Sequence, residues 1–180
     1  MSAWIAFLRG INVGGNNVLP MRALTELMEA AGCTDVKTYV QSGNAVFHSS
    51  KTTSAQLAKR IARCVAERCK FEPSVLVLSV RELEQAVAAN PFPEAESEPK
   101  SLHVFFLAES PARANIATLK VIKAENEAFS VKGKAFYLHA PDGIGQSKLA
   151  QRAERLLGVD ATGRNWRTVT RVLAMARELE

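Results

Sequence analysis

Hydrophobic residues in the first part of the chain alternate between short runs typical of strands and spaced patterns typical of helices. Residues 4–8 form an apolar run that ends at Arg9-Gly10, which predicts a buried strand. After Pro20, expected as the first helical residue, apolar side chains recur at helical spacing as far as Gly32. The buried face of this predicted helix consists of Leu24, Leu27, Met28 and Ala31.

A hairpin, a helix and a strand are predicted next. The strand-like segments 36–41 and 44–48 are joined by the tight-turn signal Ser42-Gly43. A second amphipathic helix follows the N-cap residues at 52–54, and an apolar strand occupies 75–80. The resulting order, βαββαβ, is that of a ferredoxin-like unit.

The second half is predicted to repeat this order without its last strand. The predicted elements are a strand at 102–107, a helix at 111–121, hairpin strands at 128–131 and 134–139, a helix at 147–157 and a closing helix at 165–179. The fold class is therefore α+β: a ferredoxin-like βαββαβ unit followed by a second, similar βαββα unit and a C-terminal helix. Short sequence parallels between the halves are compatible with an internal duplication and equally with chance.

The domain division follows from a change in composition. A helix is predicted at 81–89, and residues 91–99, which contain three prolines and three glutamates, have the composition of a linker. We therefore expect an N-terminal half at 1–90, a linker at 91–100 and a second half at 101–180.

Composition narrows the class of protein. The chain has 180 residues, of which 47% are hydrophobic and 23% charged, as in ordinary globular proteins. It has no apolar run of the roughly 18 residues that a membrane span needs, and its first residues lack the features of a signal peptide, so we expect a cytoplasmic protein with no membrane contact. Its three cysteines form no Cys-x-x-Cys pair, which argues against a disulfide framework or a zinc site.

The net charge of +5 is unevenly distributed, because residues 101–180 carry 12 Lys and Arg against 8 Asp and Glu. A basic second half suits an anionic ligand or nucleic acid, and it also falls within the range of proteins that bind neither. The sequence indicates neither a cofactor nor an oligomeric state.

The loop from Arg9 to Asn17 is the first of three clusters suited to ligand binding. Its glycines, which include Gly14 and Gly15, allow backbone N–H groups to turn toward a phosphate or carboxylate, and Arg9 and Asn12 add side-chain donors. The alternative interpretation is a plain glycine-rich turn between a strand and a helix. The second cluster is the hairpin that contains Gln41 and Asn44, which are also ordinary turn formers.

The third cluster lies in the second half, where Ser147 and Lys148 begin a predicted helix. Asn165 begins the closing helix and Arg164 directly precedes it. The three arginines Arg164, Arg167 and Arg171 have the spacing of one helical face, where they could hold an anion. Trp166 could stack on a base, although a place in the core is the favoured interpretation.

No catalytic or metal-binding constellation is recognisable. His48, His103 and His139 are scattered without metal-ligand spacing, and each is expected to be structural. No nucleophile elbow and no paired-carboxylate pattern are present. The sequence therefore does not indicate whether the protein is an enzyme.

Several motifs together resemble the bacterial family of domain of unknown function 1697. They are the stretches Leu8-Arg9-Gly10-Ile11-Asn12-Val13-Gly14-Gly15-Asn16-Asn17, Tyr39-Val40-Gln41-Ser42-Gly43-Asn44-Ala45-Val46-Phe47, Asn90-Pro91-Phe92, Asp142-Gly143-Ile144-Gly145-Gln146-Ser147-Lys148-Leu149 and Thr162-Gly163-Arg164-Asn165-Trp166-Arg167-Thr168-Val169. Only Gly163 and Arg167 depart from the expected pattern. The resemblance implies an α+β protein of ferredoxin-like units with no established activity, substrate or cofactor.

Two hypotheses follow for the function. In the first, a small anionic ligand, phosphorylated or nucleotide-like, binds between the two halves at Arg9, Asn12, Gln41, Asn44, Lys148, Arg164 and Asn165. In the second, the protein is a nucleic-acid-binding module, which is less favoured because its strands lack paired aromatic residues for base stacking. A protein-interaction module without a ligand is a third alternative.

Overall fold

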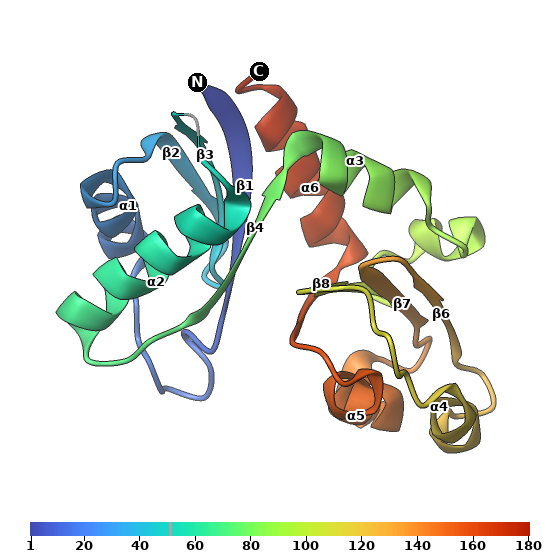
Figure 1. The fold of residues 1–180 in the computed structure, drawn as a ribbon. Helices are drawn as coiled ribbons and strands as arrows, with labels where there is room; N and C mark the ends of the chain where they lie inside the picture. The colour runs from blue at the N-terminus through green and yellow to red at the C-terminus, as the bar shows by residue number, and fades with distance from the viewer. Residues whose placement is uncertain (51) are drawn as a thin grey trace. The chain divides into compact units, whose positions relative to one another are not determined.

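The fold was obtained as a computed structural model, which describes residues 1–50 and 52–180 (Figure 1). The chain divides into two compact units. Unit 1 comprises residues 1–85 together with 171–180, and unit 2 comprises residues 86–170. The division expected from the sequence, into a half at 1–90, a linker at 91–100 and a second half at 101–180, remains a proposal. None of the described helices has the length and apolarity needed to cross a membrane.

Unit 1 has the predicted βαββαβ order. Its elements are β1 (Ser2–Arg9), α1 (Met21–Ala30), β2 (Thr34–Tyr39), β3 (Asn44–Ser49), α2 (Ser54–Cys69) and β4 (Ser74–Ser79), followed by α3 (Val80–Ala88). The sheet has the order β2-β3-β1-β4, and each neighbouring pair is antiparallel. This arrangement confirms the ferredoxin-like prediction.

Local sequence explains where the helices of unit 1 begin and end. Pro20 is the N-cap of α1 and not its first helical residue, because its ψ of 142° is extended. Gly32, with a φ of 82°, follows the helix in the left-handed conformation, and the Cys33 N–H donates to Met28 O at 3.0 Å. This is the helix end predicted from the glycine. At the start of α2, Thr53 and Gln56 cap each other's backbone reciprocally.

The core of unit 1 lies between one face of the sheet and the two helices α1 and α2. The sheet contributes alternate residues of β1 and β3, as expected for strands with one face on a core. The largest fully buried members of this cluster are Leu8, Leu19, Leu24, Met28, Phe47, Leu57 and Ile61.

Unit 2 repeats the topology of unit 1. Its elements are η1 (Pro93–Ser97), β5 (Leu102–Leu107), α4 (Ile116–Ile122), β6 (Ala128–Lys132), β7 (Ala135–His139), η2 (Ile144–Gln146), α5 (Lys148–Leu157), β8 (Ala161–Asn165) and the first part of α6 (Trp166–Arg177), whose residues from Arg171 on belong to unit 1. The sheet order β6-β7-β5-β8 is again antiparallel throughout. The predicted βαββα order is confirmed, and β8 adds the final strand that the sequence pattern did not reveal.

Two predicted boundaries in unit 2 are corrected. The helix expected from residue 111 begins at Ile116, because the Asn115 side chain caps it by accepting a hydrogen bond from the Thr118 N–H at 3.0 Å. The closing helix begins at Trp166, because the Asn165 Oδ1 accepts from the Thr168 N–H at 2.9 Å.

Candidate functional site

The opening loop between β1 and α1 contains a small hairpin. The Asn12 N–H donates to Asn17 O at 3.1 Å, and a second main-chain hydrogen bond closes the turn inside it. Gly14 and Gly15 at the tip have φ values of 57° and 77°, the left-handed values that such a two-residue turn requires at both positions. The turn itself therefore accounts for both glycines.

Asn12 ties the opening loop to the β2–β3 hairpin. Its Nδ2 donates to Leu19 O at 2.9 Å and to Gln41 O at 2.8 Å, while its Oδ1 accepts from the Leu19 N–H at 2.8 Å. The Leu8 N–H also donates to Gly43 O at 2.7 Å. The structure thus places the first two predicted clusters side by side, and it uses both amide hydrogens of Asn12 to hold them together.

The β2–β3 turn is shaped by Asn44 and Gly43. Asn44 is fully buried, and its Nδ2 donates to Tyr39 O at 3.0 Å and to Ser42 Oγ at 2.9 Å. Gly43 has a φ of 77°, and a Cβ there would lie 2.8 Å from Leu8 Cβ. These contacts support the turn-forming interpretation of Asn44.

Three exposed valines lie on these two loops of unit 1. Val13 and Val18 on the opening loop are 66% and 65% exposed, and Val40 at the β2–β3 turn is 50% exposed. Val40 has a φ of 48°, which is strained for a β-branched residue. Arg9 is half-buried at the end of β1, and Gln41 is exposed beside Val40.

In unit 2, two of the predicted ligand-binding residues cap helices. The Ser147 Oγ accepts from the Ala150 N–H at 3.1 Å at the start of α5, and Asn165 caps α6 as described above. Lys148 is exposed in the first turn of α5.

Arg164 does not lie where the spacing of the arginines predicted it. It is a residue of β8, paired with Val104, so it forms no helical face with Arg167 and Arg171 on α6. Its Nη1 donates to Gly163 O at 2.8 Å, and burial lowers the pKa of its guanidinium to about 10. The prediction that Arg164, Arg167 and Arg171 share one helical face is therefore wrong.

Two histidines and Trp166 have environments that suit structural roles. His48 Nδ1 lies 2.9 Å from Asp35 Oδ2 and His48 Nε2 lies 2.8 Å from Leu179 O, and the His48 hydrogen bond holds the pKa of Asp35 below its usual value. His103 is buried, and this burial lowers its pKa to about 4. Trp166 is buried, which confirms that it belongs to the core. Among residues 1–50 and 52–180, no three His, Cys, Asp or Glu side chains gather where they could hold a metal ion.

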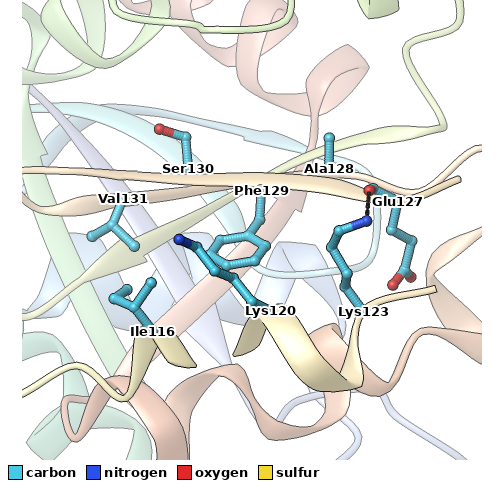
Figure 2. A pocket seen from close by; sticks show the side chains of 8 residues that line it. All are labelled: Ile116, Lys120, Lys123, Glu127, Ala128, Phe129, Ser130 and Val131. Atoms are coloured by element: carbon cyan, nitrogen blue, oxygen red, sulfur yellow. Dashed lines mark hydrogen bonds between the residues drawn. The ribbon is translucent and has the colours of Figure 1, made fainter. Parts of the chain in front are cut away.

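Sequence reasoning did not find the groove between α4 and β6 in unit 2 (Figure 2). It has a volume of about 560 Å³. Figure 2 shows the Phe129 ring and the Val131 side chain projecting from β6 toward α4, while Ser130 and Ala128 project to the opposite side. The complete lining consists of Ile116, Lys120, Lys123, Glu127, Ala128, Phe129, Ser130 and Val131.

The charged side chains of this groove differ in how far they are engaged. Lys123 Nζ donates to Ala124 O at 3.2 Å and to Glu127 O at 3.1 Å, and the Glu127 carboxylate accepts from the Ala124 N–H at 2.8 Å. Lys120 is exposed, and its side chain has no hydrogen-bond or ion-pair partner within the described part of the chain. Lys120 is therefore the cation of this groove that is available to a ligand.

One sequence signal for the groove exists in hindsight. Ile116 and Lys120 on α4 and Lys123 at its C-cap recur at i, i+4 and i+7, and Phe129 and Val131 share one face of β6. The pattern alone does not reveal that β6 is the outermost strand of its sheet, which depends on strand order.

Comparisons with known proteins agree with this fold. The chain is similar to a solved structure titled as that of the conserved bacterial protein SP0830 from Streptococcus pneumoniae, with 23% sequence identity and a TM-score of 0.72. The alignment covers 97% of this chain and 98% of that chain. A comparison with curated proteins finds no match.

The family comparison covers most of the chain. The family described as "Protein of unknown function (DUF1697)" matches residues 1–137, a range that contains both clusters of unit 1 and the whole α4–β6 groove. The resembling motifs at 142–149 and 162–169 lie outside the matched range. Since the match extends over well more than half of the sequence, the chain belongs to the DUF1697 family of proteins of unknown function.

Proposed function

We propose that the α4–β6 groove of unit 2 binds an anionic ligand that has an apolar portion. The observation that carries the proposal is the pairing of an apolar wall, formed by Ile116, Phe129 and Val131, with the unengaged ammonium group of Lys120. The volume of the groove lies within the range of about 300–1,000 Å³ that is usual for small-molecule sites. Apolar contact area would supply most of the affinity, and the lysine would orient the negative group.

The proposal keeps the negative charge of the ligand that the sequence leads us to expect, and assigns this anion to another place in the fold. Asn12, Asn44, Ser147 and Asn165 use their side chains in loop braces and helix caps. Such residues support a site only indirectly, because their polar atoms are already engaged. A cytoplasmic location remains part of the proposal.

Nucleic-acid binding has less support. Ferredoxin-like modules that bind RNA stack bases on exposed aromatic residues of the sheet. Four of the strand aromatics, Phe7, Phe47, Phe136 and Tyr137, are fully buried. The other aromatic residues of the described strands are buried or half-buried, and none of them is classed as exposed: Trp4, Tyr39, Phe105, Phe106 and Phe129. We therefore rank an oligonucleotide below a small anion as the ligand.

The test uses phenyl phosphate as the probe, because it combines an apolar ring with a dianion. Calorimetry on the full chain is expected to detect the binding of phenyl phosphate. Inorganic phosphate should bind at least about tenfold more weakly, because it lacks the ring. Lys120→Glu should weaken phenyl phosphate binding by about tenfold, which corresponds to roughly 1.4 kcal/mol.

The matched control is Lys59→Glu, which makes the same charge change at an exposed position of α2 in unit 1. It should leave the affinity unchanged. If both charge reversals weaken binding equally, the probe responds to net charge and the groove is not the site. An oligonucleotide that binds with a steep salt dependence while phenyl phosphate does not would favour the nucleic-acid alternative.

A further inference from the structure

Strand β6 offers main-chain groups to an incoming strand. It is an outer strand of its sheet and, among the strands that the structure describes, pairs only with β7, in a hairpin whose closing pair is Lys132 and Ala135. In a hairpin with a two-residue turn the closing pair is hydrogen-bonded, and bonded and non-bonded pairs then alternate. The N–H and C=O groups of Phe129 and Val131 therefore point away from β7, toward the free edge.

The hydrogen bonds around this edge support that assignment. Glu127 lies two residues before Phe129, so its main-chain groups also point away from β7. Its carbonyl oxygen accepts a hydrogen bond from the Lys123 ammonium group. Across the part of the chain that the structure describes, no further hydrogen bond reaches the outward main-chain groups of Phe129 and Val131. Phe129 and Val131 are themselves half-buried, and both line the groove.

The corresponding edge of unit 1 is irregular. Strand β2 shifts register against β3 between Thr34 and Lys37, and Asp35 within it has a φ of 52°. Such a bulge, together with charged side chains, protects a sheet edge from pairing with another chain. Strand β6 keeps a continuous register with β7 over its whole length, without a bulge.

Charge identifies the kind of strand that fits. Two lysines, Lys120 and Lys123, line the groove beside the open edge, and the acidic residue that lines it, Glu127, already accepts a backbone hydrogen bond. A cationic groove between a helix and a free strand edge has the geometry that other domains use to add a peptide strand to a sheet.

We infer that the ligand of the α4–β6 groove is an extended acidic peptide segment of another protein, which pairs with β6 as an additional strand. This inference rests on the proposed anion-binding function and names the class of partner. Main-chain hydrogen bonds to Phe129 and Val131 supply the pairing. Alternate side chains of the peptide enter the groove, where apolar ones contact Ile116 and an acidic one reaches Lys120.

A second copy of this chain fits the edge less well. Pairing β6 with itself would bring the groove lysines Lys120 and Lys123 of two copies together, and like charges at close range are unfavourable. An acidic segment has the opposite charge, so complementarity favours a foreign peptide.

The test measures fluorescence anisotropy of a labelled peptide, acetyl-Glu-Thr-Val-Thr-Val-Thr-Glu-amide, with the full chain. In an extended strand its two glutamates and two valines share one face, so that it fits the groove in either strand direction. Replacing both glutamates by lysines should weaken binding by at least about tenfold, and so should Lys120→Glu in the protein. Lys59→Glu should have no effect.

Backbone methylation separates strand pairing from contact through side chains alone. One peptide carries N-methyl groups on both valines and another carries them on the outer threonines, so only one of the two presents its methyl groups to β6. We expect one methylated peptide to lose binding and the other to bind within about threefold of the parent. Equal binding of both, or equal loss, overturns strand addition.

Phenyl phosphate, measured alongside, distinguishes the two proposals. If phenyl phosphate binds in a manner that depends on Lys120 and the peptide does not bind at millimolar concentration, the strand inference is overturned and the anion site stands. If neither probe binds, both fail. A concentration-dependent dimer that is lost in Val131→Pro would assign the edge to a second copy and overturn the inference as well.

Discussion

The two units share one topology but differ at the corresponding edge strand. In unit 1, β2 has a register shift and a left-handed Asp35, and it follows the ten-residue helix α1. In unit 2, β6 is regular and follows α4, which has seven residues. The groove of about 560 Å³ lies beside this regular strand and short helix. The comparison teaches that the shared scaffold determines where an edge lies, and that local sequence determines whether it is protected.

Unit 1 differs from unit 2 in its loops as well as in its edge strand. In unit 1 the opening loop and the β2–β3 turn are joined by the three hydrogen bonds of Asn12. The exposed residues around that junction include Val13, Val18 and Val40. Unit 1 therefore presents a braced loop region, whereas unit 2 presents a strand edge and a cationic groove.

The largest expected effect comes from the two cores, which the comparison treats as equivalent. Phe47 on β3 and Phe136 on β7 are both fully buried against the helices of their own unit. Phe47→Ala and Phe136→Ala should each lower the free energy of unfolding by about 3–5 kcal/mol, measured by urea titration. A loss below about 1 kcal/mol for one of them would show that the two cores are not equivalent.

A pH dependence specific to unit 2 is the next largest effect. The pKa of His103 is about 4 in the folded chain and near 6.5 when exposed, so the unfolded chain binds the additional proton between these values. Stability from the neutral imidazole is therefore complete above pH 6.5 and is lost as the pH falls toward 4, by up to about 3 kcal/mol.

The measurement compares urea unfolding at pH 7 and pH 4.5 for the wild type and His103→Leu. The variant should lose less stability on acidification than the wild type. His139→Gln, which changes a half-exposed histidine in the same sheet, is the control and should retain the wild-type dependence. Parallel curves for wild type and His103→Leu would contradict the assignment.

Removing the brace of unit 1 should have an intermediate effect. Asn12→Ala deletes three hydrogen bonds and leaves the Leu19 N–H without its acceptor, so the free energy of unfolding should fall by about 2 kcal/mol. Asn16→Ala, at the exposed tip of the same loop, should change it by less than about 0.5 kcal/mol. Similar losses in both variants would mean that Asn12 has no special role.

The smallest effect on stability is expected for Lys120→Glu. Lys120 is exposed and has no partner within the described residues, so its replacement should change the free energy of unfolding by less than about 0.5 kcal/mol while weakening anion binding. A large loss of stability would show that the lysine is structural and would remove the basis for the groove as a ligand site.

Much of the fold follows from sequence, because the helical and strand-like periodicities of both units are strong and their turns carry glycine. Strand β8 was missed because its sequence, Ala161-Thr162-Gly163-Arg164-Asn165, has neither an apolar run nor clear alternation. Its place in the sheet is given by pairing with β5, which is a tertiary contact. Missing this strand led directly to the wrong placement of Arg164 on a helix.

The candidate site was less predictable. Glycines and asparagines predicted anion-binding loops, because these residue types suit such loops. In the structure, Asn12 and Asn44 use their amides to hold the loops together. The groove depends on β6 being an outer strand and on Lys120 having no partner, and neither property is visible in a single sequence. Physical patterns located the loops, and only the three-dimensional arrangement revealed the groove.

The central claim is that the α4–β6 groove is the anion site. Its most direct test is a titration of the full chain with phenyl phosphate, in which the chemical shift of each backbone amide is monitored by NMR. The claim predicts shifts that concentrate at Lys120, Phe129 and Val131 and leave Gly14 and Gly15 of the opening loop unchanged. Shifts centred on the opening loop, with the α4–β6 groove unchanged, would contradict the claim and return the anion site to unit 1.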